Sequence, residues 1–392
     1  MDRRIYFDHA ATAPIDPRVA RAMETCLRRC GNPSSLHEEG RNARAAVERA
    51  RGQVAALLNC EPGEIVFTGS GTEADNLALT GVAEAGGVAG IHIITSVIEH
   101  PAILETGRYL ARRGVAVTEL PVGGDGIVDP AELQRALRPE TRLVSIMAAN
   151  NVVGTIQLLP ELARIANQHG ALFHTDAVQA AGKIPLNTQK LPVDLLSLSA
   201  HKLHGPQGVG ALFIRKGTRL GPLIHGGGQE QGLRSATENV AGLVGLGCAA
   251  ELARTEMAAE NVRLVGLRDR LINELTQAIP GVYLIGHPTR RLPGHICVGF
   301  AGLEGEAIKL LLALDEAGVA VSSGSACSTH HAGEPSQLLI AMGFDPVRAR
   351  GSLRITLGRF NTGQEIERFL EILRQSVADL RSMTTRSATA KP

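Results

Sequence analysis

Residues 194–216 read DLLSLSAHKLHGPQGVGALFIRK. Two short apolar runs flank a polar, glycine-rich link, and the first run ends in Ser199, His201 and Lys202. Short apolar runs bounded by glycine and polar residues are typical of buried strands. The stretch therefore predicts two core strands, with polar side chains where the first strand ends.

The same pattern of short apolar runs between polar segments continues toward the N-terminus. Further apolar runs of strand length are EIVFTG (64–69), IHIITS (91–96), VAVTELP (115–121), LVSIMAAN (143–150) and ALFHTDAV (171–178). Helical patterns alternate with them at 40–59, 72–86 and 101–114, and we read Ser35–Glu38 as a capping box for the first. Alternation of this kind predicts an α/β fold, with a mostly parallel sheet covered by helices on both faces.

A second, smaller α/β domain is predicted beyond residue 255. Long helical patterns (236–279, 306–318 and 364–380) alternate there with strand patterns at 294–300, 319–324 and 352–358. Residues 1–14 are too short to fold alone, so we expect them to pack on this part. The predicted domains are thus 15–255 (large) and 1–14 with 256–392 (small), with a frayed tail from Arg381.

Composition excludes several classes of protein. Apolar residues make up 44 % and charged residues 20 % of the 392 residues, and the formal charge is +1. This balance gives no basis for nucleic-acid binding, and no apolar run has membrane-spanning length. The six cysteines are scattered without a C-x-x-C pair, which argues against a disulfide framework and favours a reducing cytoplasm.

Polar residues gather where the predicted strands end. Ligands of open parallel sheets collect at the carboxyl ends of the strands. Gly71 and Thr72 lie in GSGTEADN (69–76), which is either an anion cradle at a helix start or an ordinary capped turn. Asp176, followed by Gln179, ends one strand, and a buried carboxylate there needs a cationic partner. Lys202 is either a desolvated nucleophile or a surface ammonium.

Taken together, these residues match the needs of pyridoxal phosphate. The cradle with Ser199 would hold the phosphate, Asp176 would keep the pyridine nitrogen protonated, and Lys202 would form the Schiff base. Aromatic residues are only 3 % of the chain, so His100 is a candidate to stack on the ring, although a lone histidine is more often structural.

The stretch SSGSACSTHHAGEP (322–335) carries Cys327, His330 and His331 with almost no bulky apolar residue. Cys327 is a metal ligand, a reactive nucleophile or a small turn residue on this pattern alone. Adjacent histidines point apart and no fourth ligand is evident nearby, which argues against a stable zinc site.

The chain resembles the NifS/IscS-type cysteine desulfurases, of the class-V aminotransferase group with the type I pyridoxal-phosphate fold. The resemblance runs from residue 7 to residue 360 in one order. It is carried by FDHAATAP, GNPSSLHEEG, FTGSGTEADN, IEHPAIL, NNVVGTIQ, HTDAVQAAGK, SLSAHKLHGPQGVG, HGGGQEQGLRSATEN, SSGSAC and SLRITLGRF. It implies a large domain with a seven-stranded sheet and a smaller α/β domain.

The resemblance implies a role for each matching residue. Lys202 is the Schiff-base lysine, and Asp176, Gln179 and His100 contact the cofactor ring. The phosphate contacts are Gly71, Thr72, Ser199 and His201, with Thr237 supplied by the neighbouring subunit of a homodimer. Asn151 and Arg354 hold the substrate carboxylate. Val152 and Ala236 depart from the family pattern, in which Glu and Gly are usual.

Cys327 matches the persulfide-forming cysteine of this family. The implied activity is conversion of L-cysteine to L-alanine, with sulfur delivered to an iron–sulfur scaffold or another acceptor, and with a transient iron–sulfur contact at Cys327 as the sole metal role. The Gly/Ser-rich variant resembles the group whose cysteine rides a mobile segment. Selenocysteine lyase, cystine lyase, aminotransferase and a non-enzymatic fold relative remain as alternatives.

Overall fold

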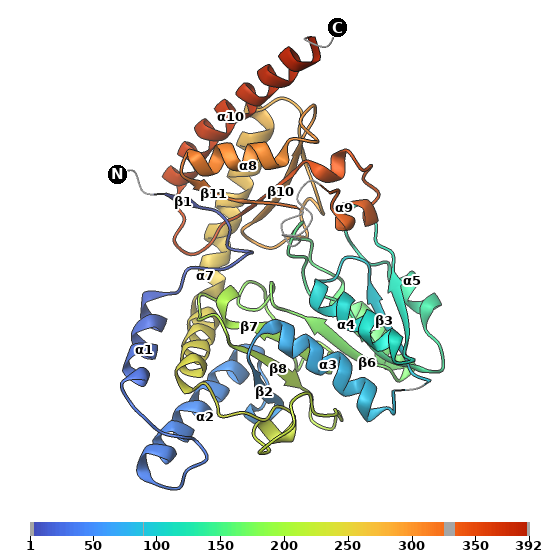
Figure 1. Ribbon diagram of the computed structural model, residues 1–392, viewed down its shortest axis with the longest axis vertical. Coiled ribbons are helices and arrows are strands. Elements are labelled where there is room, and N and C mark those ends of the chain that lie inside the picture. Colours follow the sequence, from blue (N-terminus) through green and yellow to red (C-terminus); the bar gives the residue numbers. More distant parts are fainter. Residues whose placement is uncertain (1–3, 89, 325–333, 390–392) are drawn as a thin grey trace.

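The computed structural model describes residues 4–88, 90–324 and 334–389. Cys327, His330 and His331 lie outside the described residues. Figure 1 shows a larger lower part built around one sheet and a smaller upper part, with the helix α7 (Val240–Ala278) running through both.

The larger part is organised around a seven-stranded sheet in the order β2-β8-β7-β6-β5-β3-β4. Its strands are β2 (Ile65–Thr68), β3 (His92–Ser96), β4 (Ala116–Leu120), β5 (Thr141–Ser145), β6 (Leu172–Asp176), β7 (Leu195–Ser199) and β8 (Gly210–Ile214). All neighbours from β7 to β4 are parallel, whereas β8 is antiparallel to both β2 and β7. The short link from β7 to β8 explains this reversal, since a parallel neighbour needs a crossover of a dozen residues or more. The predicted mostly parallel sheet is confirmed.

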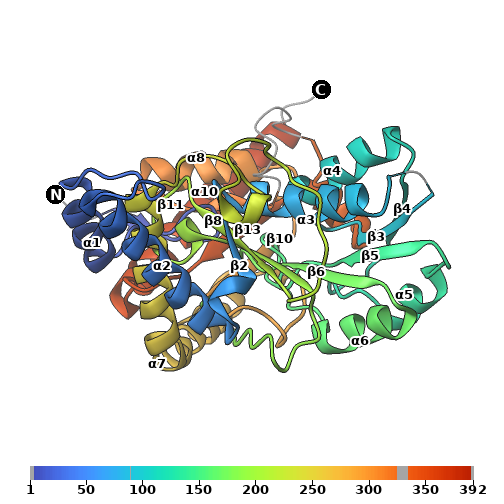
Figure 2. The same ribbon diagram turned by 90° about the horizontal axis from the view of Figure 1, so that it is seen from below.

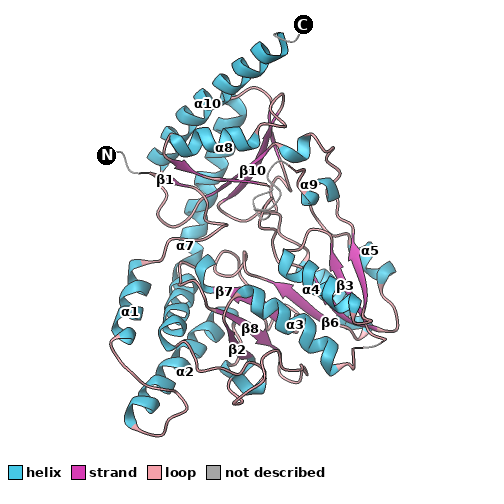
Figure 3. Ribbon diagram, in the orientation of Figure 1, coloured by secondary structure: helices cyan, strands magenta, loops and turns pink. Residues whose placement is uncertain are grey.

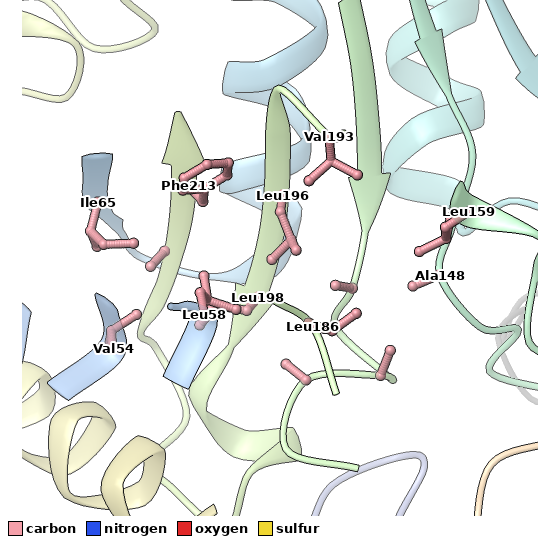
Figure 4. Packing of buried hydrophobic residues seen from close by; sticks show 14 of the residues in the cluster. Val54, Leu58, Ile65, Ala148, Leu159, Leu186, Val193, Leu196, Leu198 and Phe213 are labelled. Atoms are coloured by element: carbon pink, nitrogen blue, oxygen red, sulfur yellow. The ribbon is translucent and has the colours of Figure 1, made fainter. Parts of the chain in front are cut away.

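Helices cover both faces of this sheet, as Figure 2 shows. They are α1 (Pro17–Leu27), α2 (Glu38–Leu58), α3 (Gly71–Ala85), α4 (Pro101–Arg112), α5 (Pro130–Ala136) and α6 (Leu159–His169), with short 3-10 helices at Pro62–Glu64, Ala200–Lys202 and Glu230–Gly232. One face packs on α3 and α4. The other packs on α2, α6 and the first half of α7, where Val54 and Leu58 meet Ile65, Leu198 and Phe213 (Figure 4).

The smaller part contains a four-stranded antiparallel sheet in the order β12-β13-β10-β9 (Figure 3). Its strands are β9 (Val282–Leu284), β10 (His295–Phe300), β12 (Ser322–Ser323) and β13 (Ser352–Thr356), and its helices are α8 (Ala307–Glu316), α9 (Gln337–Ala341) and α10 (Gly363–Thr389), with a 3-10 turn at Arg348–Arg350. The N-terminal strand β1 (Ile5–Tyr6) pairs in parallel with β11 (Val319–Ala320). Residues near the N-terminus therefore pack on the smaller part.

The helix α7 contributes to two hydrophobic cores. Leu243, Leu246 and Ala253 lie in the core beneath the large sheet. Leu264 and Leu271 lie in a second core with Phe7. The predicted boundary after residue 255 falls inside this helix, between the two sets of core residues, and it stays a prediction.

Two local predictions are wrong. The cap of α2 is His37, whose side chain accepts the Gly40 N–H, so Ser35 does not begin a capping box. The helix α10 continues past Arg381 to Thr389, where we expected a frayed tail. Within the described ranges, no helix combines the length and the apolar character that crossing a membrane requires.

Candidate active site

Lys202 lies directly after β7, in the 3-10 turn Ala200–Lys202. Its amine donates hydrogen bonds to the carbonyls of Ala10 and Ala11, at 2.5 and 2.6 Å from Nζ. The turn lies between the end of β7 and the Gly-rich link, so Lys202 is placed at the edge of the sheet. Lys202 is half-buried there, which fits neither a core residue nor a free surface ammonium.

Asp176 ends β6, the parallel neighbour of β7, so its side chain emerges at the same sheet edge. It is 6 % exposed, and its Oδ1 accepts the Val178 N–H at 2.8 Å. Burial raises the pKa of this carboxyl, while the charges of His100 and Lys202 oppose the shift. A positive charge on Lys202, or on His100 if it is protonated, thus favours ionised Asp176, and the sequence grouped these three side chains.

His100 follows β3 and caps α4 with its imidazole. Its Nδ1 accepts the Ala102 N–H at 3.1 Å, so the proton of the neutral ring lies on Nε2. Burial lowers the pKa of His100, and nearby Lys202 lowers it further against the opposing effect of Asp176. The cap and the environment therefore both favour a neutral ring.

Gln179 and Lys183 are hydrogen-bonded to each other, and Gln179 also contacts the Ala10 carbonyl that accepts from Lys202. The amide Nε2 of Gln179 donates to the Ala10 carbonyl at 2.9 Å, and its Oε1 accepts from Lys183 Nζ at 3.4 Å. Burial, together with the positive charges of Lys202 and Arg354, lowers the pKa of Lys183 to about 7. Lys183 and Lys202 line one cavity of about 60 Å³.

An anion cradle lies at the start of α3. Ser70 caps the helix by accepting the Glu73 N–H at 3.0 Å, which leaves the N–H groups of Gly71 and Thr72 at the positive helix end. A Cβ on Gly71 would lie 2.6 Å from Val178 Cγ2 and 3.3 Å from Ser199 Cβ. Only glycine fits here, so the backbone can approach an anion closely.

His201 closes the other side of this edge. Its Nδ1 lies 3.1 Å from the Thr12 hydroxyl, so the N-terminal segment reaches the cradle. Burial lowers the pKa of His201 to about 4, with further lowering from Lys202 and Lys183. A bound anion is the kind of partner that would reverse such a shift.

Arg354 reaches the edge of this site from β13 of the smaller part. Its Nη1 donates to the Asn151 carbonyl at 3.0 Å, and its Nη2 donates to Asp8 Oδ1 at 2.8 Å. Its Nε is buried and makes no hydrogen bond to any residue that the structure describes. Arg354 thus contacts both Asn151 and Asp8, and its role in holding a substrate carboxylate stays a prediction.

A group of buried acids lies beneath Asp176. Glu99 accepts hydrogen bonds from Ser96 Oγ and the Met147 N–H, and burial raises its pKa to about 8. Burial, with the charge of Asp176, also raises the pKa of Asp75, whose Oδ1 lies 3.7 Å from His174 Nε2. Glu99 is thus mainly protonated near pH 7, and the pKa of Asp75 is shifted in the same direction.

Comparisons with known proteins identify the family of this chain. The aminotransferase class-V family model matches residues 5–369. A cysteine desulfurase IscS of Dictyoglomus turgidum is 49 % identical over 385 residues, covering 98 % of this chain and 97 % of its own. A cysteine desulfurase IscS of Methanosarcina thermophila is 47 % identical, at 98 % and 94 % coverage. The chain belongs to the NifS/IscS-type cysteine desulfurases of the class-V aminotransferase family.

Solved structures support this assignment to the desulfurase family. A NifS-like protein superposes with a TM-score of 0.89 at 41 % identity, covering 96 % of this chain and 99 % of its own. A NifS-like protein from Rickettsia africae gives 0.86 at 32 % identity, with 96 % and 100 % coverage. The desulfurase chain is therefore a pyridoxal-phosphate enzyme of fold type I, and the Gly71 cradle, Asp176 and Lys202 fit that cofactor.

Thr237, the predicted contact from a neighbouring subunit, lies apart from these groups on the exposed link between β8 and α7. The N-cap of α7 is Asn239, so Thr237 precedes the helix start at which we expected it. Two ion pairs hold the link in place, between Arg51 and Glu230 and between Arg234 and Glu73. The structure thus presents Thr237 outward from a well-anchored segment.

Several site residues of this desulfurase were missed from the sequence. Asp8, Glu99, Asp75 and Lys183 had no assigned role, although Asp8 stands in FDHAATAP and Glu99 precedes His100. For Glu99, a charged residue between the end of an apolar strand and the start of a helix was the available signal. Among the described residues, no group of three or more His, Cys, Asp or Glu side chains could hold a metal ion, and the five cysteines there are free.

Proposed function

We propose that this enzyme converts L-cysteine to L-alanine and receives the sulfur on Cys327 as a persulfide. The observation that supports it is the convergence of the Lys202 amine, Asp176 and a neutral His100 after the parallel strands β7, β6 and β3, with Arg354 reaching in from the smaller part. A thiol has no role in an aminotransferase, so Cys327 downstream of this site favours desulfuration.

Particular residues would hold the cofactor. Gly71 and Thr72 at the start of α3, with Ser199 and His201, take the phosphate, and Asp176 holds the proton on the pyridine nitrogen. Gln179 would contact the ring oxygen of the cofactor, and His100 would stack on its ring. When bound, pyridoxal phosphate supplies an electron sink that stabilises negative charge at the substrate Cα.

Arg354 and Asn151 would orient the substrate through its carboxylate, since the guanidinium offers a planar set of donors. The Lys202 amine then takes the Cα proton, for which it must be neutral. Because its Nδ1 is occupied by the Ala102 N–H, His100 can donate only through Nε2. We therefore assign it a donor role near the substrate sulfur.

Cys327 would act as a thiolate. Its sulfur forms an S–S bond with the substrate sulfur as the substrate Cβ–S bond breaks, and the electron pair stays with the carbon. Protonation of that carbon completes the methyl group of alanine, and the persulfide remains on Cys327. Thiolate formation needs help from a base or a positive field because an ordinary cysteine titrates above neutral pH.

We further propose that the enzyme works as a homodimer in which Thr237 completes the phosphate site of the partner. Leu27 and Leu36 are 70 % and 90 % exposed beside the α1–α2 connection, which supports a surface covered by a second copy. The test mixes Lys202→Ala and Thr237→Ala chains, each inactive alone. Hybrid dimers with one intact site would regain activity, whereas a monomeric site would not.

A more specific part of the proposal concerns the protein that accepts the sulfur from Cys327. We propose an iron–sulfur scaffold protein, in the cytoplasm, where the free cysteines remain reduced. Cluster formation on an added scaffold from L-cysteine, measured by its visible absorbance, would support this. Sulfur transfer only to other acceptors would redirect the proposal to thiolation of another product.

The deciding experiment measures alanine formed from L-cysteine by the wild type and by Cys327→Ala. Alanine from the wild type alone supports desulfuration through Cys327. Equal alanine from both would remove Cys327 as the nucleophile and favour a lyase, which selenocysteine as substrate would then test. No alanine from either, with the cofactor bound, would show that the substrate is different.

A further inference from the structure

Asp8 forms an ion pair with Arg354, the residue that the proposed function assigns to binding the substrate carboxylate. Its Oδ1 lies 2.8 Å from Arg354 Nη2, and the side chains of Asp8 and Arg354 are 15 % and 3 % exposed. The partners come from opposite ends of the chain, since Asp8 follows β1 and Arg354 lies in β13. A buried guanidinium therefore has a carboxylate of the protein itself as its counter-ion.

The second oxygen of Asp8 is also engaged. Ser322 donates its hydroxyl to Asp8 Oδ2 at 2.8 Å, and Ser322 pairs with Arg354 across β12 and β13. Both carboxylate oxygens are thus fixed from the same small sheet. Among the described residues, no other carboxylate lies within ion-pair distance of Arg354.

Arg354 keeps part of its hydrogen-bonding capacity for another ligand. Nη1 donates to the Asn151 carbonyl and Nη2 to Asp8, but Nε lacks an acceptor among the described side chains and backbone groups. A buried N–H without an acceptor is costly, and a substrate carboxylate oxygen would satisfy it. The guanidinium would then carry two carboxylates at once.

We propose that Asp8 is an internal carboxylate that shares Arg354 with the amino-acid substrate and so weakens the hold on substrate and product. This inference rests on the proposed role of Arg354. Two anions on one guanidinium repel each other, and burial strengthens the repulsion. Asp8 thereby fixes the orientation of Arg354 while it keeps alanine from being held too tightly.

Surrounding charges do not replace Asp8. The positive charge of Arg354 contributes to the lowered pKa of Lys183, so Lys183 is a further cation in the surroundings of Arg354. His295, on β10 beside β13, has a pKa far below its usual value because it is buried, and Arg354 adds to the shift. Loss of the Asp8 charge would therefore leave Arg354 without a counter-ion until a substrate arrives.

The experiment compares Asp8→Asn with the wild type. Asparagine can still accept from Arg354 and donate to the Ser322 hydroxyl, so shape is kept and only charge is lost. We expect KM for L-cysteine and the Kd for L-alanine, from calorimetry of the holoenzyme, to fall about tenfold. Cysteinol, which lacks the carboxylate, should bind both proteins equally. Asp8→Ala, which loses the orientation of Arg354, should raise KM for L-cysteine.

Other outcomes would overturn the inference. A higher KM for L-cysteine in Asp8→Asn, with cysteinol unchanged, would make Asp8 a purely orienting residue. Equal changes for L-cysteine and cysteinol would make it structural. If Asp8→Asn does not fold, Ser322→Ala replaces it: freeing Oδ2 should tighten the Asp8–Arg354 pair and raise KM for L-cysteine twofold to threefold, at unchanged cysteinol binding, and an unchanged KM would overturn the proposal.

Arg354→Lys separates this inference from the proposed function. If that variant binds L-cysteine and cysteinol as the wild type does, the carboxylate role of Arg354 is wrong, and Asp8 has nothing to share. If it loses L-cysteine affinity while Asp8→Asn changes nothing, Arg354 keeps its role and only the proposal for Asp8 fails.

Discussion

Lys183 donates from Nζ to the side-chain oxygen of Gln179 across 3.4 Å. Gln179 in turn donates to the Ala10 carbonyl, which also accepts from Lys202. Two lysine amines are thus joined through one glutamine and one backbone carbonyl. Burying the Lys183 amine near the positive charge of Lys202 is unfavourable for folding. The protonation state of Lys183 should therefore affect the free energy of unfolding, which can be measured.

Lys183→Met should stabilise the protein most at neutral and acidic pH. Burial lowers the pKa of Lys183 from its usual 10.5 to about 7. Between these two pH values the unfolded chain holds a proton on Lys183 that the folded chain lacks. Its contribution to stability therefore rises between pH 7 and 10.5. We expect a gain of about 1–3 kcal/mol at pH 7 that disappears toward pH 10.

Urea unfolding at several pH values measures this difference. Lys190→Met, at an exposed position of the same region, is the matched control and should show no such trend. A gain for Lys183→Met that stays constant across pH would contradict the prediction.

Glu99→Gln should show the opposite pH dependence: its gain in the free energy of unfolding should grow as the pH rises. Burial raises the pKa of Glu99 from 4.5 to about 8, so its favourable contribution is complete below pH 4.5 and is lost as the pH rises to 8. Glutamine keeps the acceptor for the Met147 N–H and cannot ionise. We expect the variant to exceed the wild type by about 1–3 kcal/mol at pH 8, and by little at pH 5.

Thermal unfolding at pH 5 and pH 8 checks this. Glu105→Gln, an exposed change on α4, is the control and should leave the pH dependence as it is. Equal stability of Glu99→Gln and wild type at pH 8 would show that Glu99 ionises without cost in the folded protein.

His100 has two separable roles, as ring and as helix cap. Asparagine is a good cap and alanine a poor one, so His100→Ala should lose about 1 kcal/mol of stability and His100→Asn almost none. Both lack the ring, so both should lose about 10²-fold or more in alanine formation. Measuring stability and rate together distinguishes the roles, and an active His100→Asn would leave only the cap.

Arg51→Met should destabilise the link that carries Thr237. Arg51 and Glu230 form a buried pair at 2.7 Å, and Glu230 also accepts the Phe67 N–H. An unpaired buried Glu230 costs about 3–5 kcal/mol. Adding Glu230→Gln should restore much of the loss, while Arg49→Met on the exposed side of α2 should change little.

Those variants also report on the site. Pyridoxal-phosphate affinity, from fluorescence titration of the apoprotein, should weaken in Arg51→Met and recover in the double variant. Unchanged affinity together with lost stability would confine the ion pair to folding and would weigh against a role for this link in the phosphate site.

Much of the large sheet follows from the sequence because its strands are short apolar runs with polar ends. Asp176 and Lys202 could be placed at one edge because parallel neighbours end together. The reversal of β8 was not predicted, although the short link between β7 and β8 was an available signal for it. The cap of α2 was misplaced by two residues because His37 caps in place of the usual serine.

The pairing of Asp8 with Arg354 could not be predicted from local patterns. Asp8 and Arg354 are 346 residues apart, and only the pairing of β1 with β11 and the placement of β13 bring them together. The tail of α10 also escaped prediction, because its polar residues lack the apolar stripe of a packed helix.

The N-terminal segment has a consequence for the order of folding. Ile5 pairs with Val319, and the residues that follow supply the Ala10 carbonyl to Lys202 and the Asp8 carboxylate to Arg354. During synthesis, these first residues leave the ribosome long before the strands that receive them exist. The large sheet can form meanwhile, but closing so long a loop is slow. The contacts of this segment with Arg354, and the packing of Ile5 and Phe7 in the core of the smaller part, can therefore form only after β11 and β13 have been made.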